Sequence, residues 1–388
     1  MRLRLRSIAT AAAFAVAVAS CAGATPASPA GPVTNPPPTS AGNPVATPTP
    51  SSTTSTPFGA RILGTASVFD APCILDGAQI RPDLLFWTDC DRSTPSLTSR
   101  IIGYSRPSGP SGVLYQPQRA GAAVGLQQIS AGWITWSEYL DRSTAKDTKL
   151  FALARGSSTA ILIDDMTAHG PLASLTDMTL DGSDVYWTLP LVENGVWHGR
   201  LMRRHLPDGQ ATVAVQAPLG SIIGWPTISG GMMAYELRSQ TAHPQDHVVL
   251  RFPNGETRQL TDTASSEPAM GDGFVAFKAA ERFDQGQLAA YRFQDGDTLP
   301  LGAGEGPFAA GPYVTWLPLT PKDDIVRLAR PLAGCVDKLS EKPIPGLSRP
   351  YVGFGSMSWV VRATEASAVD ARVFVAPITV AAGASCTP

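Results

Sequence analysis

Short apolar segments that carry an aromatic residue at or near their end recur along this chain at nearly regular intervals. The intervals between successive aromatic residues, taken as differences of their residue numbers, are 49, 51, 48, 42, 39 and 43 residues. A period of about 40–50 residues predicts an array of supersecondary units, as in propellers and solenoids. The aromatic residues are Trp87, Trp136, Trp187, Tyr235, Phe277, Trp316 and Trp359.

Each repeat contains four short apolar runs separated by turn residues. A run rich in small residues, such as PTISGG, precedes the aromatic segment, and a run such as KLFALAR follows it. A turn rich in Gly, Pro and Asp, such as residues 207–209, then leads to a last run, such as ATVAVQ. The sequence therefore predicts an all-β fold, a seven-bladed β-propeller of four-stranded antiparallel blades over residues 58–388. We expect the repeated aromatic residues to fill the core between blades.

Closure of the ring requires a strand for the last blade. The run at residues 61–69 precedes the first full repeat and has no partner of its own. We expect it to form the outer strand of the seventh blade, while the C-terminal run at residues 378–386 competes for that place.

The first twenty residues are typical of a bacterial lipoprotein signal peptide. Arg2, Arg4 and Arg6 precede a short apolar core that is too short to span a membrane. Small residues then lead directly to Cys21, which we expect to be lipidated and to become the first residue of the mature protein. Ordinary cleavage nearby, which would give a secreted protein, is the alternative.

Residues 21–57 are predicted to form a disordered tether behind the lipidated cysteine. Between Ala22 and Pro57 there are ten Pro and thirteen Ser or Thr residues and no charged residue. Such a segment has few large apolar side chains to bury. We therefore expect an extracytoplasmic protein that is anchored to a bacterial membrane through its N-terminal lipid.

One stretch resembles a known repeat. Residues 254–279, NGETRQLTDTASSEPAMGDGFVAFKA, resemble the repeat of TolB-like β-propellers. The resemblance implies the propeller fold, without the N-terminal α/β domain of TolB, because the tether takes its place here. The matching residues are Leu260, Thr261, Pro268, Asp272, Gly273, Ala276 and Phe277.

Four cysteines remain besides Cys21, and an even number in an exported protein suggests two disulfides. Three pairings are possible. We favour Cys73 with Cys90, which bracket a predicted hairpin, and Cys335 with Cys386, which follow equivalent strands in the last two blades. Free buried thiols are the alternative.

The composition excludes several classes of function. Without the three arginines of the signal peptide, 27 basic residues face 32 acidic ones, a net charge of −5, and no basic run suggests nucleic-acid binding. Nucleophilic-serine, phosphate-loop and dinucleotide motifs are absent. We expect no metal or cofactor, and we interpret Asp164 and Asp165 as solvated loop charges.

The loops that follow the aromatic strands are long and share one rim of the predicted propeller, so we expect any binding surface there. Ordinary loop packing explains the same residues equally well. We favour a non-catalytic scaffold that binds an envelope protein, peptide or glycan; the alternative is a hydrolase or lyase acting on extracellular carbohydrate. The candidate rim residues are Asp141, Arg142, Lys146, Trp197, His198, His243, His247 and Arg282.

Overall fold

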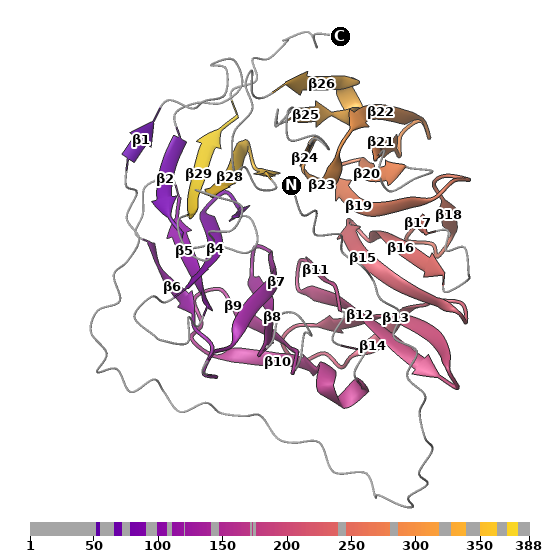
Figure 1. Ribbon diagram of the computed structural model, residues 1–388, viewed down its shortest axis with the longest axis horizontal. Coiled ribbons are helices and arrows are strands. Elements are labelled where there is room, and N and C mark those ends of the chain that lie inside the picture. Colours follow the sequence, from indigo (N-terminus) through magenta and orange to yellow (C-terminus); the bar gives the residue numbers. More distant parts are fainter. Residues whose placement is uncertain are drawn as a thin grey trace, which may run out of the picture. The chain divides into compact units, whose positions relative to one another are not determined.

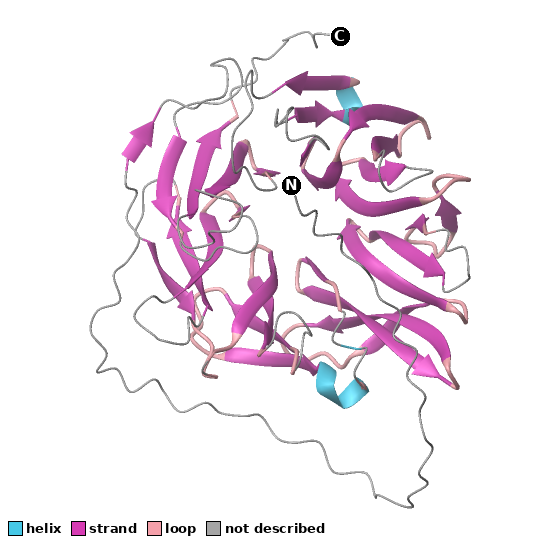
Figure 2. Cartoon of the chain, in the orientation of Figure 1, coloured by secondary structure: helices cyan, strands magenta, loops and turns pink. Residues whose placement is uncertain are grey.

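The computed structural model describes parts of one compact unit, residues 44–388. In the part of the chain that it describes, strands dominate and helix is confined to short 3-10 turns such as η1 (Met166–His169) and η4 (Pro331–Ala333) (Figure 2). No helix among these residues is long and apolar enough to cross a membrane. The described residues are 52–54, 66–71, 78–90, 99–106, 111–119, 121–140, 147–170, 173, 176–239, 246–279, 286–317, 327–338, 350–362 and 371–378.

The strands form antiparallel groups of four, as the repeat predicts (Figure 1). The first group contains β3 (Gln79–Ile80), β4 (Leu84–Cys90), β5 (Ser99–Ser105) and β6 (Ser111–Tyr115). The second contains β7 (Ala123–Ile129), β8 (Trp133–Tyr139), β9 (Lys149–Ala154) and β10 (Ala160–Asp165). The third contains β11 (Met178–Asp181), β12 (Asp184–Glu193), β13 (Val196–His205) and β14 (Thr212–Gln216).

The next three groups repeat this order of pairing. The fourth contains β15 (Ser221–Ser229), β16 (Met232–Ser239), β17 (His247–Arg251) and β18 (Thr257–Gln259). The fifth contains β19 (Ser265–Gly271), β20 (Phe274–Ala279), β21 (Gln287–Arg292) and β22 (Thr298–Ala303). The sixth contains β23 (Glu305–Ala310), β24 (Tyr313–Leu317), β25 (Arg327–Arg330) and β26 (Cys335–Lys338). The third and fourth groups join into one eight-stranded sheet through a single parallel bridge between His198 and Ser221.

The seventh group takes a strand from the N-terminal side of the propeller. Strands β27 (Tyr351–Gly353), β28 (Ser356–Arg362) and β29 (Ala371–Pro377) are completed by β2 (Ala66–Asp70), which pairs antiparallel with β29. The predicted closure is therefore confirmed for Ala66–Asp70, and residues 61–65 of the expected run lie outside the described residues. A further strand, β1 (Ser52–Thr54), pairs with β2, so three residues inside the predicted disordered tether are in fact part of this sheet.

From β7 to β27 the first strands of successive groups contact one another in sequence order. Strand β3 contacts β27 and β5 contacts β7, so the groups follow one another around a ring like propeller blades. In Figure 1, β7, β11, β15, β19 and β23 face the middle of the ring. The repeated aromatic residues lie on the second strand of each blade and are at most 5% exposed. Burying one such side chain contributes about 2–3 kcal/mol, and the predicted aromatic core is confirmed.

The core clusters cross from one blade to the next. Trp87 of the first blade packs with Phe69 and Val373 of the seventh, and the two aromatic rings lie 5.4 Å apart. Trp187 of the third blade likewise packs with Leu150 and Met166 of the second. The aromatic residues therefore hold neighbouring blades together.

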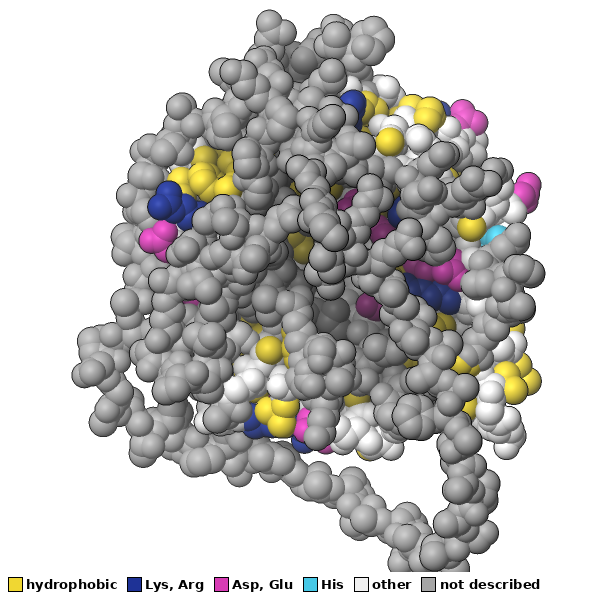
Figure 3. Space-filling model, in the orientation of Figure 1, with side chains coloured by type: hydrophobic (Ala, Val, Ile, Leu, Met, Phe, Trp, Pro, Cys, Tyr) yellow, Lys and Arg dark blue, Asp and Glu magenta, His cyan; other side chains and the backbone are white. Residues whose placement is uncertain are grey.

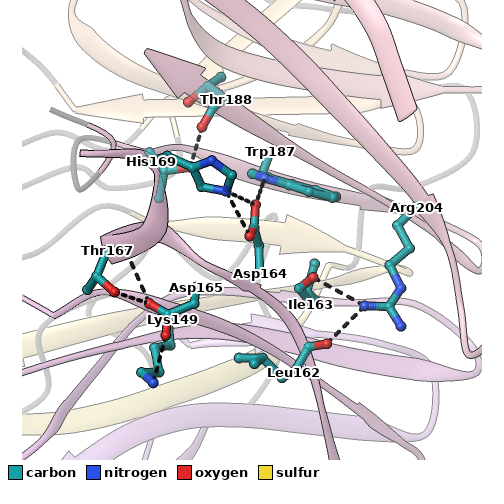
Figure 4. A network of polar contacts seen from close by, with 11 residues as sticks. Lys149, Leu162, Ile163, Asp164, Asp165, Thr167, His169, Trp187, Thr188 and Arg204 are labelled. Carbon is teal, nitrogen blue, oxygen red and sulfur yellow. Dashed lines mark hydrogen bonds and ion pairs between the residues drawn. The ribbon is translucent and has the colours of Figure 1, made fainter. Parts of the chain in front are cut away.

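Trp187 also shows how a buried indole N–H is satisfied. Its Nε1 donates to Oδ2 of Asp164 at 3.0 Å, and the same carboxylate lies 3.0 Å from Nε2 of His169 (Figure 4). The neighbouring Asp165 accepts from the backbone N–H of Thr167 at the start of η1 and pairs with Lys149 at 2.8 Å. The interpretation of this acidic pair as solvated loop charges was therefore wrong, because both carboxylates connect elements of the fold.

Candidate functional site

Most of the rim residues predicted from the sequence lie outside the described residues, namely Asp141, Arg142, Lys146, His243 and Arg282. The same holds for Cys21, Cys73, Cys386 and the side chains of Cys90 and Cys335, so the disulfides and the lipid anchor stay predictions. His247 is described as the half-buried first residue of β17.

Trp197 and His198 lie in a strand, whereas the sequence analysis placed them in a loop. Strands β12 and β13 pair over their full length, so that Trp197 lies opposite Val192 and His198 opposite Leu191. The turn between them is only Asn194-Gly195, with φ angles of 54° and 78°. An Asn-Gly pair is the preferred sequence for such a type I′ hairpin turn, and this dipeptide was the signal that the sequence analysis missed.

The described residues bring polar groups together elsewhere, on the inner strands of the fourth, fifth and sixth blades. In each, two residues of the first strand lie opposite a single aromatic residue of the second strand, which is a β-bulge. The first bulge residue has a positive φ: 48° at Trp225, 53° at Glu267 and 58° at Gly306. A proline follows each of them.

Each of these bulges directs a backbone N–H at a carboxylate of the preceding blade. Trp225 N donates to Oδ2 of Asp177 at 2.9 Å, and Glu267 N donates to Oε2 of Glu236 at 3.3 Å. Gly306 N donates to Oε2 of Glu267 at 2.7 Å. A hydrogen bond to a charged group contributes about 1.5–3 kcal/mol, which offsets the cost of about 1–2 kcal/mol for a side chain in the left-handed region. Carboxylates therefore connect blades three to six in series.

Two of these carboxylates, Asp177 and Glu236, act together with Asp246 on one arginine, Arg238. Arg238 Nε donates to Oε1 of the buried Glu236 at 2.6 Å. Burial alone would lower the pKa of Arg238, but Glu236, Asp177 and Asp246 together raise it. On the face seen in Figure 3, acidic and basic side chains lie next to each other right of the centre. Three carboxylates for one guanidinium leave this cluster with a net negative charge if all are ionised.

The pKa of Asp246 reflects this excess of carboxylates. Burial and the neighbouring charge of Glu236 raise the pKa of Asp246 to about 6, although Arg238 acts in the opposite direction. Burial also raises the pKa of Asp177, against the effect of the Trp225 N–H. A carboxyl group with a raised pKa beside a second carboxyl group, as Asp246 lies beside Glu236, can share a proton with it or act as an acid.

Glycine shapes the space for this cluster at one position. A Cβ atom on Gly224 would lie 3.1 Å from Cζ of Arg238, so a side chain there would compete with the guanidinium. Among the residues that the structure describes, no three His, Cys, Asp or Glu side chains are grouped as a metal site.

Comparisons with known proteins give no match to a protein-family model or to a curated protein sequence. Solved structures do match. The β-propeller domain of the Trilobed protease from Pyrococcus furiosus has 10% identity and a TM-score of 0.51, and the match covers 77% of this chain and all of that domain.

A prolyl endopeptidase matches with 12% identity and a TM-score of 0.51, over 75% of this chain but only 46% of its own, so this chain spans about half the length of that enzyme. TolB from Acinetobacter baumannii matches with 11% identity and a TM-score of 0.43, over 67% of this chain and 64% of its own. The match to a propeller domain over its whole length confirms the β-propeller architecture that the sequence predicted. The chain is a β-propeller.

Proposed function

We propose that this protein is an extracytoplasmic propeller lipoprotein that serves as a non-catalytic binding scaffold for an envelope protein, peptide or glycan. A lipid on Cys21 and the Pro-rich tether hold the propeller to a bacterial membrane. Several acyl chains on one cysteine give firm anchoring, whereas a single chain binds only marginally.

One observation carries this proposal: the inner carboxylates have structural partners. Asp177, Glu236 and Glu267 each accept a backbone N–H from the next blade. A glycosidase-type enzyme needs a pair of carboxyl groups whose oxygens face the substrate. Here these oxygens connect blades, which favours a rigid scaffold whose loops bind.

Capture from the envelope fraction of the source cells tests the proposal. The detergent-solubilised full-length protein is immobilised and the retained material is identified by mass spectrometry. We expect one envelope protein, peptide or glycan, whose retention falls when Trp197 is changed to Ala. Leu332→Ala, which alters an exposed side chain in η4, is the control and retains the ligand. Equal retention by an unrelated lipoprotein would refute the proposal.

The alternative is a hydrolase or lyase acting on extracellular carbohydrate. The contact between Asp246, with its raised pKa, and Glu236 favours it, because an acid and a charged carboxylate side by side are the groups such chemistry uses. Turnover of polysaccharides by the wild type, abolished in Glu236→Gln and in Asp246→Asn, would establish this second function in place of the first.

A further inference from the structure

Seven equivalent hairpins join the first and second strands of the blades. Each has a two-residue turn, which in the first two blades is closed by the bonds from Arg81 N to Leu84 O and from Ser130 N to Trp133 O. Successive turns of an antiparallel sheet lie at opposite ends, so these hairpins form the rim opposite to the Asn194-Gly195 turn. The first residues of the seven turns are Pro82, Ala131, Gly182, Gly230, Asp272, Gly311 and Phe354.

Phe354 is the exception among them. Its φ is 49°, and the three other first turn residues with positive φ are glycines, at 58–60°. A bulky side chain in this region is strained. Burial does not compensate the strain, because Phe354 is 51% exposed. Backbone strain that is not offset by burial of the side chain is typical of residues at binding sites.

One arginine contacts this ring, and two others bind to residues of the same and the neighbouring turn. The guanidinium carbon of Arg81 lies 5.1 Å from the centre of the Phe354 ring. Arg106 donates to Oγ of Ser356 at 2.5 Å and to the carbonyl oxygen of Arg81 at 3.0 Å. Arg155 pairs with Asp83, so among the residues that the structure describes this group holds three cations and one carboxylate.

The cations also disfavour one another. Burial lowers the pKa of Arg81, and the charge of Arg155 lowers it further. Asp83 is 60% exposed at its side chain and is already paired with Arg155. An additional anion at this place would therefore be attracted by charges that the protein itself only partly balances.

We propose that Phe354, Arg81, Arg106 and Arg155 form a binding site for the carboxylate-bearing sugars of an acidic polysaccharide. Guanidinium groups match carboxylates in geometry and charge, and an exposed aromatic ring offers a flat apolar surface for the C–H face of a sugar ring. The turns stand at the exposed ends of the sheets, where Pro82 and Asp83 are also exposed. An extended polymer laid across the rim fits this exposure better than an enclosed small molecule.

Titration calorimetry of the full-length protein with an oligogalacturonate tests the proposal. We expect binding that weakens as salt is added, because the three arginines are only partly buried and salt screens their charges. A neutral cello-oligosaccharide and poly-glutamate, which lacks the sugar ring, are expected to bind at least about tenfold more weakly. No binding of the oligogalacturonate, or equal binding of poly-glutamate, would overturn the proposal.

Phe354→Asn separates binding from folding. It creates Asn-Gly, the same pair that forms the turn at residues 194–195 with closely similar φ angles. We expect about tenfold weaker oligogalacturonate binding together with a melting temperature raised by about 2 °C. Unchanged binding, or a lower melting temperature that marks Phe354 as a structural residue, would contradict the inference.

Two further variants complete the design. Arg155→Gln is expected to weaken binding and to flatten its salt dependence, and Leu219→Ala, at an exposed position on the opposite rim, is expected to change neither. This site goes beyond the proposed scaffold function, whose test uses Trp197. The two tests address opposite rims of the propeller. A failure of oligogalacturonate binding at Phe354 therefore leaves the capture test with Trp197→Ala unaffected, and the reverse also holds.

Discussion

Asp246→Asn is expected to stabilise the protein at neutral pH. The carboxyl group of Asp246 has a pKa raised to about 6 by burial and by Glu236. In the unfolded chain the same group releases its proton near its ordinary pKa of 3.8. Stability is therefore lost as the pH rises from about 4 to about 6. It stays lost at higher pH, because the charge of Asp246 is then partly buried beside Glu236. Asparagine resembles the protonated form at every pH.

The size of the effect follows from the two pKa values. The difference between 3.8 and about 6 corresponds to about 3 kcal/mol. Asp246 is only half-buried, so solvent screening reduces this figure, and we expect about 1–2 kcal/mol. At pH 7.5 the variant should exceed the wild type by this amount, and near pH 4 the difference should vanish.

Urea unfolding of both proteins between pH 4 and pH 8 measures this difference as a free energy of unfolding. Asp262→Asn, a change at an exposed aspartate close to β18 and β19, is the matched control and should shift stability equally at all pH values. The reasoning would be refuted if Asp246→Asn were less stable than the wild type at pH 7.5, or if its advantage were the same at pH 4.

Three further predictions concern the fold. Asp89→Leu should lower the free energy of unfolding in urea by about 3–5 kcal/mol, because Arg100 then stays buried without its partner. In the wild type, Nε of Arg100 lies 2.6 Å from Oδ1 of Asp89. The double variant Asp89→Leu/Arg100→Met should lose less than about 1 kcal/mol. Equal losses in both would contradict this. Asp164→Ala should cost about 1–3 kcal/mol by leaving the Trp187 indole N–H unsatisfied, and an unchanged melting temperature would disprove that role. Asn194→Val should lower the unfolding free energy by about 1–2 kcal/mol, because a β-branched residue disfavours its φ of 54°; a neutral result would count against the turn.

The repeat architecture could be predicted from the sequence because its signal is long-range. The regular spacing of seven aromatic residues identifies the repeat even when a single strand is assigned wrongly. All seven residues lie in the core. The closing strand followed from counting strands, and the structure describes it over Ala66–Asp70.

The carboxylate contacts could not be predicted, because they depend on the bulges. The sequence carries one signal for these bulges, a proline after Trp225, Glu267 and Gly306. Only the strand register shows that each proline and the residue before it lie opposite a single aromatic residue of the second strand. The partners come from different blades: Glu236 and Glu267 are 31 residues apart in sequence. The residues that flank Glu236 or Glu267 in the sequence do not indicate that its carboxylate accepts a backbone N–H from the next blade.

The strand assignment of Trp197 was missed for a different reason. Leu189 to Gly199 contains Pro, Glu, Asn and Gly, a composition typical of a loop. The backbone nevertheless pairs throughout, because the two-residue turn at 194–195 sets the register of the hairpin. Local composition was the weaker signal, and the turn dipeptide was the stronger one.

Capture from the envelope fraction with Glu236→Gln beside the wild type tests most directly whether the inner carboxylates hold blades together or act on a substrate. Both proteins are compared at equal amounts of folded protein, and the retained material is identified by mass spectrometry. A scaffold whose Glu236 is structural retains the same ligand in the same yield in both. Retention by the variant of an intact glycan that the wild type releases in shortened form would mark Glu236 as a catalytic group and contradict the account.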